Sequence, residues 1–209
     1  MTHTLVALHG FTMNGEVMRD ALDPLVTALA PKIRVVCLNA PHPCSAEAVE
    51  RMYRDTSEAS RTAPHLCWWR ASDDGLEYRG WPETRDLVRE ALDRYAPASV
   101  LGFSQGGILA AAVAALAQSR ELPPIHAAVL IAGRKPRAAN LQAAFMTPVV
   151  VPSLHVWGER DTITRQYSEE LVECFSAPER EVMRWPGGHV IPTRGPAFDA
   201  IVRFLTEHA

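Results

Sequence analysis

The stretch VLGFSQGGILAAAVAALA, residues 100–117, decides the fold, because an apolar strand-like run meets a helix-like run at a single serine, Ser104. Its surroundings fit the pattern G-x-S-x-G, with Gly102 and Gly106 two positions away on either side. Between a strand and a helix, this pattern is typical of a strained turn that holds a serine hydroxyl clear of the sheet. Glycines at those two positions relieve the crowding that a positive φ creates. The stretch therefore predicts a nucleophilic serine; the structural alternative is a serine that caps the helix beginning at Gln105.

Short runs rich in Val, Leu and Ile alternate along the whole chain with longer amphipathic segments. The six runs are TLVALHG (4–10), IRVVCLNAP (33–41), SVLGFS (99–104), AAVLIAG (127–133), SLHVWGE (153–159) and EVMRWPGG (181–188). The helices expected between and after them lie near 15–30, 46–60, 82–96, 105–119, 164–176 and 196–208. Several runs are apolar at consecutive positions, as in parallel strands covered on both faces. The alternation predicts an α/β fold, with a mainly parallel six-stranded sheet flanked by helices.

Length and composition limit the classes of protein that the chain can belong to. A length of 209 residues suits one domain, 1–209, and 47% apolar with 22% charged residues is typical of a globular protein. A formal charge of −3 gives no reason to expect a nucleic-acid partner. The apolar run from Gly106 to Ala117 is too short to span a membrane, so we expect no membrane partner. The N-terminus does not resemble a signal peptide, and the four cysteines show no C-x-x-C spacing, so we expect a cytoplasmic protein with reduced thiols.

A serine hydroxyl needs a base to take its proton, and the base needs a carboxylate to orient it. His189 in WPGGHVIP follows the last predicted strand and is the expected base. Asp161, in the loop after the fifth strand, is the expected acid, with Glu159 as its rival. The order Ser104, Asp161, His189 is the chain order of α/β-hydrolase sites. Because ligand sites gather at the carboxyl ends of parallel strands, we expect the three side chains to meet there.

Two backbone amides are candidates for stabilising a negatively charged oxygen during reaction. One belongs to Gln105, at the positive end of the helix that follows Ser104. The other belongs to Phe11, in the loop after the first strand, where Gly10 permits a close approach. His9 precedes this loop and is expected to brace it or to border the substrate pocket.

Aromatic and basic residues between the strands are the candidate pocket walls. Trp69, in a segment that also holds Trp68, Tyr78 and Trp81, is the candidate for an acyl pocket, which suggests short or medium acyl groups. The basic run Arg134, Lys135 and Arg137 follows a strand end. It is either a solvated loop or a contact for an anionic substrate, such as a carboxylate or the phosphates of a pantetheine carrier.

Six stretches together resemble the family of serine hydrolases called FSH, within the α/β-hydrolase superfamily. They are LHGFTMNGEVM, NAPHP, WWR, GFSQGG, PSLHVWGERDTI and PGGHVIP, in that order along nearly the whole chain. The resemblance implies a compact hydrolase without a large cap domain, and it assigns the triad to Ser104, Asp161 and His189. The related carboxylesterase and acyl-protein thioesterase group shares much of this pattern.

The function expected from these observations is hydrolysis of small to medium carboxylic esters or thioesters through an acyl-enzyme, without a cofactor or metal. Two alternatives remain. One is an acyl-carrier or coenzyme A thioesterase or acyltransferase, which would share the acyl-enzyme. The other is a non-catalytic protein that binds small molecules in a hydrolase pocket. The sequence predicts neither the oligomeric state nor the physiological substrate.

Overall fold

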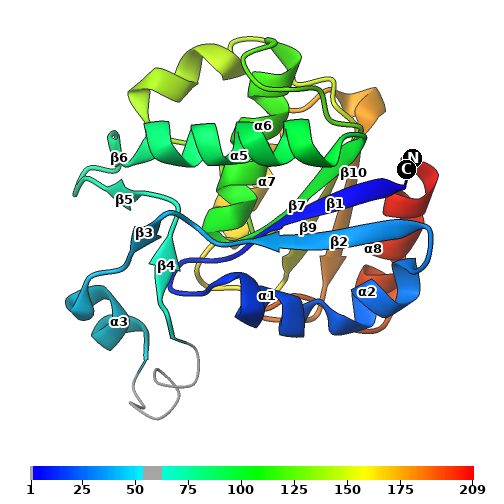
Figure 1. The fold of residues 1–209 in the computed structure, drawn as a ribbon, viewed down its shortest axis with the longest axis horizontal. Coiled ribbons are helices and arrows are strands. Elements are labelled where there is room, and N and C mark those ends of the chain that lie inside the picture. The colour runs from blue at the N-terminus through cyan, green and yellow to red at the C-terminus, as the bar shows by residue number, and fades with distance from the viewer. Residues whose placement is uncertain (1, 54–62) are drawn as a thin grey trace.

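A computed structural model describes residues 2–53 and 63–209, and its centre is a six-stranded sheet (Figure 1). The strands lie in the order β10-β9-β8-β7-β1-β2, and every neighbouring pair is parallel. Their bounds are β1 (His3–Leu8), β2 (Ile33–Leu38), β7 (Ala98–Phe103), β8 (Ala128–Ile131), β9 (Ser153–Gly158) and β10 (Arg180–Trp185). All six predicted strands are thus present, and the predicted α/β fold with a parallel six-stranded sheet is confirmed.

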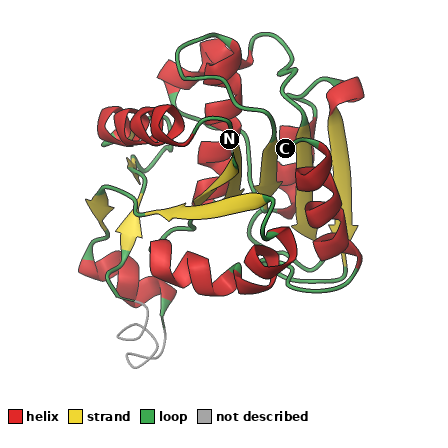
Figure 2. Cartoon of the chain, turned by 45° about the vertical axis from the view of Figure 1, so that its right-hand side comes forward, coloured by secondary structure: helices red, strands yellow, loops and turns green. Residues whose placement is uncertain are grey.

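Helices cover both faces of this sheet (Figure 2). One face carries α1 (Gly15–Ala21), α2 (Asp23–Leu29) and α8 (Pro196–Glu207). The other carries α5 (Trp81–Tyr95), α6 (Gln105–Gln118), α7 (Arg165–Val172) and the 3-10 helix η1 (Ala139–Phe145). A second 3-10 helix, η2 (Ala177–Glu179), precedes β10. The single helix expected near 15–30 is two helices, because Pro24 suits the first turn of a new helix and not the interior of a long one.

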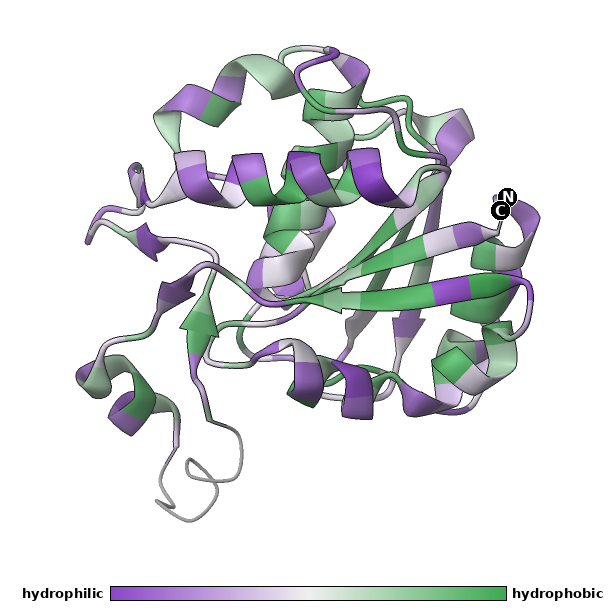
Figure 3. Ribbon diagram, in the orientation of Figure 1, coloured by the Kyte–Doolittle hydropathy of each residue, from purple (hydrophilic) through white to green (hydrophobic). Residues whose placement is uncertain are grey.

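Successive side chains of β1 point to opposite faces of the sheet, and they contribute to two separate layers of the apolar core. Leu5 and Ala7 belong to the cluster under α1, α2 and α8, whereas Val6 and Leu8 belong to the cluster under α5 and α6. Side chains of a strand point to opposite faces in turn, so a fully buried strand serves both layers. Apolar residues accordingly dominate the central strands, while α5 and the helices on the opposite face mix apolar and polar positions (Figure 3).

A segment between β2 and α5, here called the excursion (residues 39–53 and 63–80), lies beyond the carboxyl end of β2 (Figure 1). It contains the short antiparallel pairs β3 (His42–Pro43) with β4 (Leu66–Cys67) and β5 (Arg70–Ala71) with β6 (Tyr78–Arg79). It also contains α3 (Ala46–Met52), which covers the first half of the helix expected at 46–60; residues 54–60 of that prediction lie outside the described residues. None of the helices in 2–53 and 63–209 is long and apolar enough to cross a membrane.

Candidate active site

Ser104 stands at the corner between β7 and α6, with φ of 54° and ψ of −115°. Its amide donates to the carbonyl oxygen of Ile131 on β8, at 2.9 Å, which fixes the corner to the neighbouring strand. A Cβ at Gly102 would collide with the carbonyl of Gly106, and one at Gly106 would collide with the carbonyl of Leu8. The corner therefore needs glycine on both sides, because three stretches of backbone meet there with no room for side chains.

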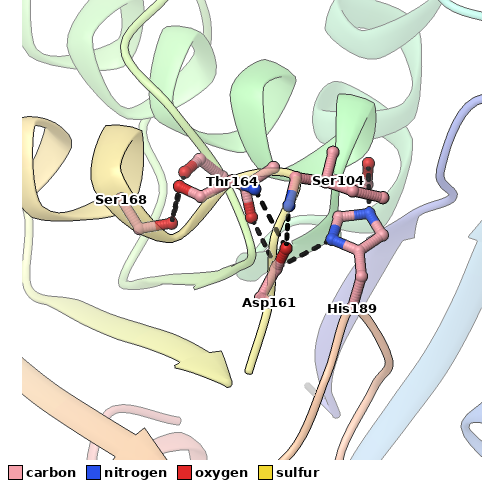
Figure 4. A network of polar contacts seen from close by, with 7 residues as sticks. Ser104, Asp161, Thr164, Ser168 and His189 are labelled. Atoms are coloured by element: carbon pink, nitrogen blue, oxygen red, sulfur yellow. Dashed lines mark hydrogen bonds and ion pairs between the residues drawn. The ribbon is translucent and has the colours of Figure 1, made fainter. Parts of the chain in front are cut away.

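Ser104, His189 and Asp161 form a continuous chain of hydrogen bonds (Figure 4). The Nε2 atom of His189 lies 3.0 Å from Oγ of Ser104, and its Nδ1 lies 2.8 Å from Oδ2 of Asp161. An ionised carboxylate only accepts hydrogen bonds, so Nδ1 of the neutral imidazole carries the proton. The lone pair of Nε2 then faces the serine hydroxyl. The arrangement is able to take the hydroxyl proton and hold it.

The Asp161 carboxylate is fully buried, and four donors surround it. Its Oδ1 accepts from the amides of Ile163 (2.8 Å) and Thr164 (2.9 Å), and its Oδ2 accepts from the Thr164 hydroxyl (2.7 Å) and His189. Burial by itself would raise the pKa of Asp161, but these hydrogen bonds outweigh burial and hold the pKa below its usual value. The carboxylate is therefore charged and fixed in orientation toward His189.

The rival acid Glu159 does not reach His189. Glu159 is exposed, and its backbone amide donates to the carbonyl of Trp185 at 2.8 Å. The difference follows from position, since Glu159 leaves β9 directly while Asp161 lies within the turn that leads into α7. Of the two carboxylates considered from sequence, the structure joins Asp161 to the histidine.

Phe11 and Gln105, whose amides are the candidate donors, both border the cavity beside Ser104. Neither donates a hydrogen bond to another group within the described residues. For Gln105 this is expected, because the first amides of a helix have no acceptor in the preceding turn. Within the described residues, both amides therefore lack an acceptor.

His9 does not border the cavity, contrary to one of the two placements expected from sequence. It is fully buried, and its Nε2 accepts from the amide of Ala40 at 3.0 Å, so its Nδ1 carries the proton and donates to the carbonyl of Gly10 at 2.8 Å. Burial lowers its pKa to about 4, which keeps the ring neutral. The Trp68 indole donates to the His9 carbonyl at 2.8 Å. These contacts hold the loop that carries Phe11.

The cavity beside Ser104 has a volume of about 510 Å³. Trp69 is part of its wall and stacks on Tyr78, with ring centroids 4.4 Å apart and planes inclined by 9°. Phe11, Ile108 and Ile163 add apolar surface. Trp68, Tyr78 and Trp81 are buried behind this wall and do not border the cavity.

The side chain of Gln105 is a contact that the sequence did not predict. Its Oε1 accepts from the amide of Trp68 at 3.0 Å, and its Nε2 donates to the carbonyl of Trp69 at 3.0 Å. One side chain at the start of α6 therefore fixes the backbone of the pocket wall in the excursion. The only sequence signal was the position of Gln105 next to the serine, which drew attention to its backbone amide instead.

Two thiols and three guanidinium groups also border the cavity. Cys44 and Cys67 share a hydrogen bond that lowers the pKa of Cys44 and raises that of Cys67. The arginines are Arg51, Arg70 and Arg134; of these, only Arg134 was a candidate from sequence. Lys135 and Arg137 border a separate hollow. In the part of the chain that the structure describes, no group of three or more His, Cys, Asp or Glu side chains is arranged to hold a metal ion.

Solved structures with the same arrangement of strands and helices define the fold. An esterase called PE8 superposes with a TM-score of 0.70 at 20% identity, covering 100% of this chain and 93% of that one. A carboxylesterase from Mesorhizobium loti gives 0.68 at 18% identity, covering 98% and 88%. At such identities the likeness shows the fold alone, and that fold is the α/β-hydrolase fold.

Sequence comparison gives the family. Residues 1–201 match the family described as Serine hydrolase (FSH1), and the chain belongs to it. Esterase OVCA2 of Bos taurus is 31% identical over 220 residues, covering 98% of this chain and 96% of the relative. Esterase OVCA2 of Homo sapiens has the same identity and coverage. The chain is therefore an ester-cleaving serine hydrolase, as the sequence resemblance predicted.

Proposed function

We propose that the chain, acting as one domain over residues 1–209, hydrolyses carboxylic esters of small to medium acyl groups through an acyl-enzyme on Ser104. The observation that carries this proposal is the relay from Ser104 through His189 to Asp161, with spacings of 3.0 and 2.8 Å, at the wall of a cavity. Nucleophile, base and orienting acid within hydrogen-bond reach of each other are the signature of an activated serine.

In the first half-reaction, Oγ of Ser104 attacks the carbonyl carbon while its proton moves to Nε2 of His189. The buried Asp161 carboxylate stabilises the imidazolium that forms. The carbonyl oxygen becomes negatively charged and accepts hydrogen bonds from the amides of Phe11 and Gln105. When the tetrahedral intermediate collapses, the bond to the leaving oxygen breaks and His189 returns its proton to that oxygen. An alcohol leaves, and the acyl group stays on Ser104.

In the second half-reaction, His189 takes a proton from water as the water oxygen attacks the acyl carbonyl. Collapse of this second intermediate returns the proton to Oγ of Ser104 and releases the carboxylic acid. A thioester would react by the same steps with a thiol as the leaving group. An alcohol or amine in place of water would give acyl transfer, so the acyl-enzyme is common to these alternatives.

A fluorophosphonate probe tests the proposal because it reacts only with an activated serine. We expect labelling of one peptide, the one containing Ser104, and none in Ser104→Ala. Ser104→Ala and His189→Ala should each lower ester turnover by about a million-fold. A folded protein that takes no label and cleaves no ester would instead support the binding-protein alternative.

A further inference from the structure

Among the described residues, those that carry charge at the cavity beside Ser104 are arginines, in a protein whose formal net charge is −3. Arg51, Arg70 and Arg134 border it, and no aspartate or glutamate of residues 2–53 and 63–209 does. Within the described residues, none of the three guanidinium groups forms an ion pair with a carboxylate, whereas Arg180 on β10 and Arg203 on α8 both do. Like charges that face one cavity without counter-charges create a strong local potential for an anion.

Contacts with a backbone carbonyl and with an aromatic ring hold two of these arginines in place. Nη2 of Arg70 donates to the carbonyl of Pro43 on β3 at 2.9 Å. Arg134 lies over the ring of Tyr167, 5.8 Å from its centroid. The carbonyl of Gly133, just before Arg134, accepts from the Ser168 hydroxyl at 2.7 Å, which ties this loop to α7. Arg70 on β5 and Arg134 after β8 therefore belong to two separate anchored segments that border the cavity.

Positive charge continues beyond the cavity. Arg134 also borders a second hollow of about 490 Å³, together with Lys135 and Arg137. Glu170 is the acidic residue in the lining of that hollow. The two hollows therefore adjoin at Arg134. An anionic group bound to Arg134 would also have Lys135 and Arg137 in the lining of the second hollow.

We propose that the natural substrate is an ester or thioester that carries a carboxylate or phosphate group, and that Arg70 and Arg134 bind this group while the carbonyl lies at Ser104. Guanidinium groups suit this task, since their planar forks donate pairs of hydrogen bonds to carboxylate or phosphate oxygens. Trp69, Phe11 and Ile108 would contact the hydrocarbon part. The inference rests on the proposed ester hydrolysis at Ser104 and names the chemistry of its substrate.

Matched pairs of esters test for the anion. On the acyl side, mono-4-nitrophenyl adipate is compared with 4-nitrophenyl hexanoate. On the leaving-group side, 4-(carboxymethyl)phenyl hexanoate and 4-(phosphonomethyl)phenyl hexanoate are each compared with 4-ethylphenyl hexanoate. Each kcat/KM is divided by the rate constant for hydroxide hydrolysis of the same ester, which removes differences in intrinsic reactivity. The arms distinguish carboxylate from phosphate and the acyl side from the leaving-group side.

We expect the normalised kcat/KM of at least one anionic ester to exceed that of its neutral partner by about tenfold or more at low salt. Hydrogen bonds between a guanidinium group and an anion are strong enough to give such a ratio. The ratio should fall as ionic strength rises, because salt screens exposed charges. Arg70→Gln and Arg134→Gln should each move the ratio toward one, and Arg70→Lys should keep part of it. The control Arg85→Gln, on the outer face of α5, should keep the wild-type ratio.

Ratios near one in every arm for the wild-type protein would overturn the inference, whatever the variants do. A wild-type preference that survives in both glutamine variants would overturn the assignment to these arginines. Failure of the proposed function looks different, since no ester, neutral or anionic, would then be cleaved in a manner that depends on Ser104.

Discussion

The sheet edge that carries Ser104, Asp161 and His189 and the excursion beside it are held in different ways. Close backbone contacts fix the serine corner, where the Ser104 amide bonds to β8 and Gly106 touches the carbonyl of Leu8. The excursion shares two backbone hydrogen bonds with the 12–13 loop, through Leu66, and otherwise meets the edge through side chains.

This difference separates two tasks. The geometry of the reacting groups follows from strand order and backbone packing, which tolerate little change. The wall of the cavity depends on a few bonds from side chains to backbone, so single substitutions there should alter substrate selection while the reacting groups keep their places. Three predictions test this separation, first at the edge and then at the two side chains that connect the regions.

The largest loss of activity is expected for a substitution at the sheet edge that carries the reacting groups. Asp161→Asn keeps the shape of the side chain but removes its charge and disturbs the tautomer of His189, so kcat for ester hydrolysis should fall by about ten-thousand-fold. The matched control is Glu159→Gln, two residues away and exposed, which should leave kcat within about twofold. Steady-state kinetics on 4-nitrophenyl hexanoate measures both. A greater loss in Glu159→Gln than in Asp161→Asn would refute the assignment of the acid.

A pH-dependent effect is expected at His9, which connects the Phe11 loop to Ala40 at the start of the excursion. Its folded pKa is about 4, below its ordinary value of 6.5, so the unfolded chain binds a proton between these pH values and the folded chain does not. The stability from His9 is therefore complete above about pH 6.5 and is lost as the pH falls toward 4. Between pH 7 and 5 the loss should be about 2 kcal/mol.

Urea unfolding at several pH values measures this loss, and His9→Gln should remove its share of the pH dependence. The matched variant is His155→Gln, because His155 on β9 is also buried and burial lowers its pKa to about 3. Both variants should flatten the pH dependence of stability. Only His9→Gln should also lower kcat, by several-fold, because His155 lies in the core and contacts Ser153 and Phe175. Equal kcat values in the two variants would mean that His9 has no influence on the Phe11 loop.

Sequence reasoning predicted the sheet because its signals are local. Runs such as TLVAL and VLGFS identify buried strands by themselves, and the glycine pattern around Ser104 identifies the corner between β7 and α6. The two small antiparallel pairs were not predicted, since each strand has two residues and pairs across an intervening segment, as β3 does with β4. So short a strand has no periodicity to read.

The candidate site also contains residues that local sequence signals predict and residues that they do not. Ser104, Asp161 and His189 follow strand ends, so the rule that parallel strands place their carboxyl ends at one edge predicted that they meet. Arg70 and the Gln105 side chain follow no such rule, because their positions depend on how the excursion packs. His9 was expected either to border the pocket or to brace the loop, and its burial removes the first option. Thr164, three residues after Asp161, was missed, although a turn with an Asp side chain accepting from later amides is a local motif.

The smallest effect is expected at Gln105, whose side chain joins the edge to the pocket wall. Gln105→Met keeps the length of the side chain and the backbone amide but leaves the Trp68 amide and the Trp69 carbonyl without their partner. Relaxation of Trp69 should lower kcat/KM for 4-nitrophenyl hexanoate by about threefold and weaken discrimination between acyl lengths, at a stability cost of about 1–3 kcal/mol.

The same helix supplies the control, because Gln118 at the other end of α6 also makes two hydrogen bonds to a distant backbone. Its Nε2 donates to the carbonyl of Pro148 at 3.2 Å, and its Oε1 accepts from the amide of Val150 at 2.6 Å. Gln118→Met should therefore lower stability and leave kcat/KM and chain-length preference within about twofold. If the two variants lost kcat/KM equally, the loss would reflect general loosening of α6. A loss confined to Gln105→Met would mean that one side chain sets the position of the cavity wall relative to the reacting serine.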